Sequence, residues 1–144
     1  MQQALWLQKF VEIYTELGTK DFQVLNLIYD PDVEFIDPMH RILGATCLIH
    51  YFDRLYTNVE SCRFVIDHII ESDNEAALYW TMTYQHRKLN GGREITVAGH
   101  SHLKATDGLV VYHRDYFDAG AMVYEGIPLL GSMIRMIKKR SGDV

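Results

Sequence analysis

Two aspartates stand among apolar residues, where a carboxylate can act as a general base. Asp37 lies in VEFIDP (33–38), and Asp115 lies inside LVVYHRDYFD (109–118). Apolar surroundings raise the pKa of a carboxyl group toward the range useful for proton transfer. The middle of a strand is unfavourable for aspartate, so Asp115 needs a buried donor or has a function. For Asp37 the alternative is structural, because such residues often cap turns or accept backbone N–H groups.

Acid–base chemistry by these carboxylates also needs hydrogen-bond donors and a second proton carrier, and hydroxyl and imidazole groups can supply them. Tyr14, Tyr84 and Ser101 are candidate donors to an oxyanion, and His113 is a second proton carrier two residues before Asp115. The catalytic candidates are Asp37, Asp115 and Tyr14, in a site that needs no cofactor.

Apolar residues at alternate strand positions are expected to form the wall of a small-molecule pocket. The alternative is that they are simply core. A glycine in the middle of a strand either leaves room for a ligand or marks a bend. The predicted ligand-binding residues are Phe35, Leu55, Trp80, Met82, Tyr84, Val97, Gly99, Ser101 and His113.

The first part of the chain predicts helices and one short strand. Apolar residues recur at helical spacing up to Gly18, and the pair Asp30-Pro31 disfavours helical dihedral angles. The expected elements are a helix ending at Gly18, a short helix over 22–29, a strand over 33–37 and a helix over 45–56.

After Val59 the pattern changes to long runs rich in β-branched and aromatic residues, separated by the turn signals SDNE, NGG and TDG. Four antiparallel strands are expected, at 60–70, 76–89, 93–105 and 109–118. Strands of this length curl. Helices followed by a meandering sheet indicate an α+β fold, in which a cone-shaped sheet wraps the helices in a single domain, 1–144.

Alternation along the last strand places Val111, His113 and Asp115 on one face and Val110 and Tyr112 on the other. Neither face is cleanly polar, so the convex face is expected to be covered by a second subunit. A homodimer is therefore predicted.

Composition narrows the possible partners. The 144 residues include 14 Lys and Arg against 19 Asp and Glu, for a net charge of -5, the wrong sign for binding nucleic acid unassisted. No apolar run approaches the ~20 residues that span a bilayer, and the N-terminus lacks the pattern of a secretion signal. A cytoplasmic protein is predicted, with Cys47 and Cys62 as free thiols and with no membrane partner.

Cofactor motifs are not evident. NGG at 90–92 matches no phosphate-binding loop. His100 and His102 form an H-x-H pair, but no metal-binding spacing accompanies it. No metal or cofactor is therefore expected. The segment 119–140 predicts a turn and a helix with a basic end, as a flap over the mouth of the cone or, alternatively, a membrane-surface helix.

The order of two helices, VEFIDP, a third helix and four strands ending in HRDYFD resembles the SnoaL-like proteins of the nuclear transport factor two superfamily. That superfamily includes ketosteroid isomerases, limonene epoxide hydrolases and polyketide cyclases. The resemblance covers nearly the whole chain and implies the cystatin-like α+β cone. Members have unrelated activities, so it implies the fold more strongly than the reaction.

The resemblance to ketosteroid isomerases places their general-base aspartate at Asp37 and their oxyanion-donating tyrosine at Tyr14. A third group, a protonated aspartic acid in that family, falls on Ser101. A serine hydroxyl can donate to an oxyanion, though more weakly than a neutral carboxylic acid.

From LNGG to RDYFD the chain is similar, without gaps, to limonene epoxide hydrolases, and Asp115 matches one aspartate of their Asp-Arg-Asp triad. The arginine and second aspartate fall on Met82 and Tyr84. The tyrosine and asparagine that hold the lytic water fall on Phe35 and Asp37. The group that opens the epoxide is therefore missing from this chain.

These observations together predict a protein that binds a small, mostly apolar organic molecule, with isomerase, cyclase or hydrolase chemistry. The alternative is a non-catalytic ligand-binding or dimeric assembly module of the same fold.

Overall fold

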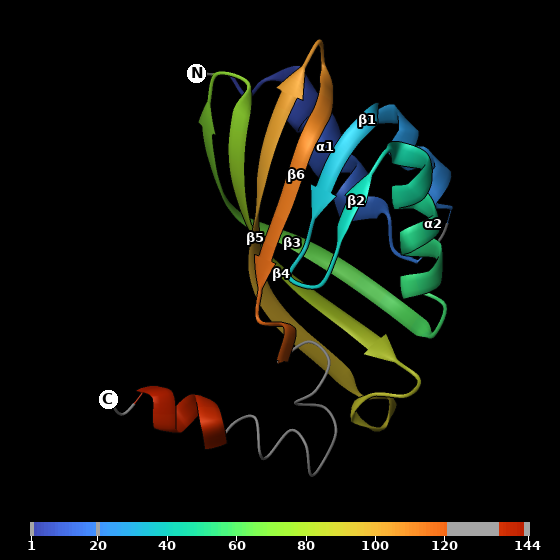
Figure 1. The fold of residues 1–144 in the computed structure, drawn as a ribbon, viewed down its shortest axis with the longest axis vertical. Coiled ribbons are helices and arrows are strands. Elements are labelled where there is room, and N and C mark those ends of the chain that lie inside the picture. The colour runs from blue at the N-terminus through green and yellow to red at the C-terminus, as the bar shows by residue number, and fades with distance from the viewer. Residues whose placement is uncertain (1, 20, 121–135, 143–144) are drawn as a thin grey trace.

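A curved six-stranded sheet is built around short helices (Figure 1). The computed structural model describes residues 2–19, 21–120 and 136–142. The elements in chain order are α1 (Leu5–Glu16), the 3-10 helix η1 (Phe22–Leu27), β1 (Tyr29–Ile36), β2 (Arg41–Leu43), α2 (Ala45–Leu55), β3 (Val59–Ser72), β4 (Glu75–His86), the 3-10 turn η2 (Asn90–Gly92), β5 (Glu94–Thr106) and β6 (Leu109–Phe117).

The strand order across the sheet is β2-β1-β6-β5-β4-β3. Strands β3 to β6 pair in sequence and antiparallel, as predicted. Strand β1 lies parallel to β6, with Phe35 opposite His113, and β2 covers the other edge of β1. The parallel pair is what brings the VEFIDP segment beside the HRDYFD segment.

The helix predicted over 22–29 is shorter than expected. It is a 3-10 helix that ends at Leu27, and Tyr29 already belongs to β1. Tyr29 pairs with Val110, whose N–H donates to the Ile28 carbonyl at 2.8 Å. The pairing of Tyr29 with Val110 therefore overrides the helical pattern of the sequence. Local sequence does not reveal such a contact between distant segments.

A β-bulge interrupts the alternation predicted for β6. The pairing passes from Lys104 with Tyr112 to Ala105 with Val110, so Val111 is an extra residue. Val110 is consequently buried on the same side as His113, and the prediction that placed Val111 on that side is wrong. Bulges of this kind bend a strand, as the curvature of the sheet requires.

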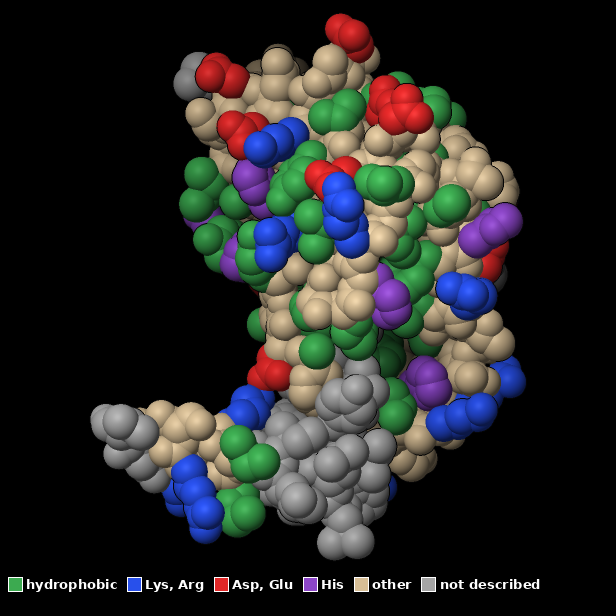
Figure 2. Space-filling view, in the orientation of Figure 1, with side chains coloured by type: hydrophobic (Ala, Val, Ile, Leu, Met, Phe, Trp, Pro, Cys, Tyr) green, Lys and Arg blue, Asp and Glu red, His purple; other side chains and the backbone are tan. Residues whose placement is uncertain are grey.

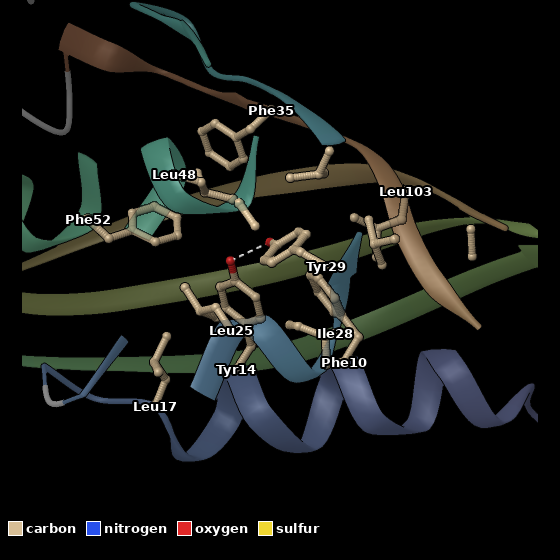
Figure 3. Packing of buried hydrophobic residues seen from close by; sticks show 14 of the residues in the cluster. Phe10, Tyr14, Leu17, Leu25, Ile28, Tyr29, Phe35, Leu48, Phe52 and Leu103 are labelled. Carbon is tan, nitrogen blue, oxygen red and sulfur yellow. Dashed lines mark hydrogen bonds between the residues drawn. The ribbon is translucent and has the colours of Figure 1, made fainter. Parts of the chain in front are cut away.

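The main hydrophobic core lies between α1, η1, α2 and the concave face of the sheet. Figure 3 shows Phe10 and Tyr14 of α1 facing Leu25, Ile28 and Tyr29, with side chains of α2 beyond. The buried polar residues that the structure describes are Asp37, Ser101 and His113. All three belong to the candidate site.

Most of the predicted C-terminal segment, 119–140, lies outside the described residues. Residues 136–142 are helical, and Lys138 pairs with Asp118 just beyond β6. Whether this segment forms a flap stays a prediction. No described helix is long and apolar enough to span a membrane.

Candidate functional site

Asp115 is held by two neighbours on the concave face of the sheet. Ser101 lies directly opposite Asp115 in the antiparallel pair of β5 and β6, and His113 precedes it by two residues on the same face. Ser101 Oγ donates to Asp115 Oδ1 at 2.5 Å, and His113 Nε2 lies 2.5 Å from the same oxygen. The side chain of His113 is 2% exposed and that of Asp115 is 18% exposed. Asp115 is thus an oriented carboxylate that still reaches open space.

The hydrogen-bond network extends from Asp115 in two directions. Trp80 Nε1 donates to Ser101 Oγ at 2.9 Å. On the other side, His113 Nδ1 lies 2.7 Å from the Tyr29 hydroxyl, which lies 2.6 Å from the Tyr14 hydroxyl.

The directions of these bonds follow from Asp115, because an ionised carboxylate only accepts. Ser101 and His113 Nε2–H therefore donate to it. With a neutral imidazole ring, His113 Nδ1 accepts from Tyr29, whose hydroxyl oxygen accepts from Tyr14. Each hydrogen bond in both branches of the network is then donated in the direction of Asp115.

The tyrosines in this network remain protonated. Burial raises the pKa of Tyr14 and of Tyr29 far above the ordinary value of 10.0, and the negative charge of Asp115 raises both further. Both hydroxyls are therefore neutral donors throughout the physiological pH range.

Asp37 forms a second polar centre where β1 turns into β2. Its Oδ1 accepts from the backbone N–H groups of Met39 and His40, at 2.8 and 2.7 Å. Its Oδ2 accepts from the Tyr51 hydroxyl of α2, which also lies 3.2 Å from His40 Nδ1. Burial, followed by the bond to Asp37, raises the pKa of Tyr51. Asp37 therefore holds a turn, as the structural alternative anticipated, and also faces the pocket.

A pocket lies between these two centres, with an interior volume of about 60 Å³. Its walls are mostly aromatic and aliphatic. Of the residues predicted from sequence, those in its lining are Tyr14, Phe35, Asp37, Leu55, Trp80, Met82, Ser101, His113 and Asp115.

Three predicted ligand-binding residues do not line this pocket. Tyr84 and Val97 are buried in a second hydrophobic cluster with Ile95. A Cβ atom on Gly99 would lie 2.6 Å from Trp80 Cη2 and 2.7 Å from the Tyr116 carbonyl oxygen. Gly99 thus makes room for the Trp80 ring and for the neighbouring strand.

Neither Tyr29 nor Tyr51 was predicted from the sequence as a member of the site. Tyr29 ends the helix predicted over 22–29, and Tyr51 lies within the helix predicted over 45–56. The polar end of a buried tyrosine usually finds a partner, which is the only signal the sequence carries for either residue.

The expected histidine pair lies away from the pocket. His102 Nε2 contacts Glu75 at 2.9 Å, and the His100 ring stacks on Tyr116. Within the described part of the chain, no three His, Cys, Asp or Glu side chains are grouped closely enough to hold a metal ion.

The sequence of residues 8–113 matches the SnoaL-like domain family. This chain belongs to that family. Among curated proteins, no sequence matches the chain.

Solved structures share the SnoaL-like fold across most of this chain. An NTF2-like protein of unknown function from Burkholderia pseudomallei K96243 is 20% identical, with a TM-score of 0.75 over 89% of this chain and 98% of that one. A proposed SnoaL-like polyketide cyclase from Jannaschia sp. CCS1 is 14% identical, with a TM-score of 0.72 over 85% and 94%. A protein of ketosteroid isomerase-like fold from Catenulispora acidiphila DSM 44928, solved in complex with trimethylamine, is 11% identical, with a TM-score of 0.73 over 89% and 95%. At these identities the likeness shows the fold alone.

Proposed function

We propose that this SnoaL-like protein binds a small, mostly apolar organic molecule in the pocket and acts on it by cofactor-free acid–base chemistry, with Asp115 as the base. The supporting observation is the one-sided bonding of Asp115. Its Oδ1 takes the hydrogen bonds from Ser101 and His113, whereas Oδ2 has no hydrogen-bond partner among the described residues. Oδ2 is therefore the oxygen that can take a proton from a bound molecule and return it to a different atom.

The other groups of the site have supporting roles in this proposal. With a neutral His113 ring, the Tyr14 hydroxyl donates its hydrogen bond to Tyr29, so we assign Tyr14 a positioning role rather than that of a donor to the substrate. Asp37 fixes the turn at the mouth and adds a second negative charge. Met82 stands where limonene epoxide hydrolases carry an arginine, so the proposal is a proton shift, cyclisation or hydration rather than opening of an epoxide by that triad.

The first experiment is native mass spectrometry of the purified protein together with a thermal-shift screen of steroids, terpenoid epoxides and polyketide-like phenols. A ligand that binds only the folded state raises the unfolding temperature by mass action. With a substrate in hand, Asp115→Asn is expected to lower turnover by about 10²-fold or more. An Asp115→Asn variant with full turnover would remove the mechanism.

A second candidate is a non-catalytic, dimeric ligand-binding or assembly module, and the outer face of the sheet favours it. Ring contacts join His68 to Tyr79, Tyr79 to His100 and His100 to Tyr116 across four strands. Figure 2 shows hydrophobic and histidine side chains mixed along the left side of the sheet. An exposed, partly aromatic sheet face of this kind fits a partner surface.

The homodimer is proposed through this face. Light scattering at micromolar concentration is expected to give twice the monomer mass, and Tyr79→Glu is expected to give a monomer that keeps the pocket. A wild-type protein that stays monomeric would exclude the dimer. We also propose that residues 1–144 form a single domain of a cytoplasmic protein, in keeping with its free thiols, which cell fractionation tests.

A further inference from the structure

We infer that the ligand of this pocket is a small organic cation, an amine or a quaternary ammonium compound. The inference deepens the proposed function and rests on it, because it names the class of molecule that the same pocket takes.

The charge of the pocket wall is the first argument. Asp37 and Asp115 both line the pocket, whereas none of the described lining residues is a lysine or an arginine. The side chain of Asp37 is only 5% exposed. Carboxylates removed from water are usually paired with a cation. The hydrogen bonds that Asp37 and Asp115 accept come instead from backbone N–H groups, hydroxyl groups and an imidazole ring.

The histidines near the two carboxylates do not remove this excess of negative charge. A neutral His113 ring satisfies both of its bonds, because Nε2–H donates to Asp115 and Nδ1 accepts from Tyr29. His40 Nδ1 lies 3.6 Å from Asp37 Oδ1, but its side chain is 52% exposed and His40 is not among the residues that line the pocket. A charge on His40 would be screened by water. The interior of the pocket therefore carries negative charge without a fixed partner.

Aromatic rings supply the second argument. The aromatic residues in the pocket lining include Phe10, Phe35, Phe52, Phe64, Trp80 and Phe117. The negative face of an aromatic ring attracts a cation, and this attraction is strongest where water is excluded. Rings and carboxylates around one cavity are the combination that recognises alkylated ammonium groups.

The third argument is the lack of free hydrogen-bond donors. Among the described lining residues, Tyr51 donates to Asp37 and Ser101 donates to Asp115. With a neutral His113 ring, the Tyr14 hydroxyl donates to Tyr29. Trp80 donates to Ser101, and the Tyr56 hydroxyl is bonded to Cys62. An anion or a developing oxyanion would find no unused side-chain donor among these groups, whereas a cation finds the free Oδ2 of Asp115.

This charge preference also agrees with base chemistry at Asp115. When Asp115 takes the N–H proton of a bound ammonium group, the products are a neutral amine and a neutral carboxylic acid, so no oxyanion forms and no oxyanion donor is required. The pocket then needs only an acceptor oxygen and a surface that stabilises positive charge.

Three probes of nearly the same shape test the inference: choline, 3,3-dimethylbutan-1-ol and 3,3-dimethylbutanoate. They carry the charges +1, 0 and −1 on similar branched skeletons. Each is titrated into the full chain near neutral pH by NMR, with the indole N–H signal of Trp80 as the marker of the pocket. Choline is expected to bind about tenfold more tightly than the alcohol, and the carboxylate most weakly.

Asp115→Asn and Asp37→Asn are each expected to reduce the preference for choline over the alcohol to within about threefold. Asp53→Asn, on the exposed face of α2, makes the same change in net charge outside the pocket and is expected to keep the full preference.

Equal affinities for choline and the alcohol would overturn the inference and leave the proposed ligand site standing. Binding of none of the three probes would overturn it as well, and the screen of larger molecules would then test the proposed function separately. An unchanged preference in both aspartate variants would also overturn it. If neither variant folds, the wild-type comparison of the three probes decides.

Discussion

The hydroxyl groups of Tyr14 and Tyr29 lie 2.6 Å apart inside the core, although one residue comes from a helix and the other from the first strand of the sheet (Figure 3). Tyr29 also reaches His113 Nδ1, so one hydroxyl links the α1 helix to the carboxylate on β6. A buried pair of this kind fixes the imidazole ring and, through it, Asp115. The orientation of the Asp115 carboxylate thus depends on residues that do not touch it.

The tyrosine pair leads to a prediction of non-additive stability. Tyr29→Phe leaves both the Tyr14 hydroxyl and His113 Nδ1 without a partner, and we expect it to cost about 2–3 kcal/mol. Tyr14→Phe leaves the Tyr29 bond to His113 intact and is expected to cost about 1 kcal/mol. The double variant should cost less than the sum, by about 1 kcal/mol. Urea denaturation measures the change in unfolding free energy for each variant. If the changes of the two single variants simply added up in the double variant, the two tyrosines would not belong to one network.

The same pair predicts a loss of stability at alkaline pH. The folded state holds the Tyr14 and Tyr29 protons above pH 10.0, where an unfolded chain releases them. Stability is therefore independent of these groups below that pH and falls above it, by about 1.4 kcal/mol per pH unit for each tyrosine. Denaturation curves across this range check the slope. The Tyr14→Phe/Tyr29→Phe double variant should show a shallower fall, and an equal slope would count against the assignment.

The sequence predicted the parts of the fold that repeat over many residues. The long strands and the helix around Tyr51 show clear periodicity, and the alternation of Trp80, Met82 and Tyr84 places all three inward as expected. It did not predict the parallel pairing of β1 with β6, because that contact joins distant segments. It also missed the bulge at Val111, which is set by how β6 bends against β5.

The sequence predicted only those members of the candidate site that local periodicity brings together. Asp115, Ser101 and His113 share a strand pair, so register and alternation are enough to bring them together. Tyr29 and Tyr51 join the site only through tertiary contacts. Gly99 shows another limit. The sequence predicted either room for a ligand or a bend in the strand, whereas in the structure Gly99 makes room for the Trp80 ring and a neighbouring backbone carbonyl.

Gly99 leads to a third prediction, on packing. Gly99→Ala would place a methyl group 2.6 Å from Trp80 Cη2 and 2.7 Å from a backbone oxygen, so the ring and the strand must both shift. We expect a destabilisation of about 1–3 kcal/mol, the usual cost of overpacking. Trp fluorescence should change as well, because Trp80 loses its bond to Ser101. Trp80→Phe in the same background should recover only part of the loss, since the backbone contact remains. Full recovery would show that the ring alone sets the need for glycine.

Two substitutions of Asp37 separate its structural role in the turn from a role of its charge in the pocket. Asp37→Ala leaves two backbone N–H groups and the Tyr51 hydroxyl without their acceptor, and we expect it to destabilise the fold by about 2–4 kcal/mol. Asp37→Asn keeps an oxygen for the turn and removes the charge, so its cost should be nearer 1 kcal/mol. Asp53→Asn on the exposed side of α2 should change stability by less than about 0.5 kcal/mol. Thermal and urea denaturation rank the three variants. If Asp37→Asn were as damaging as Asp37→Ala, the negative charge itself would stabilise the fold, and Asp37 would need a cationic partner within the protein rather than in a ligand.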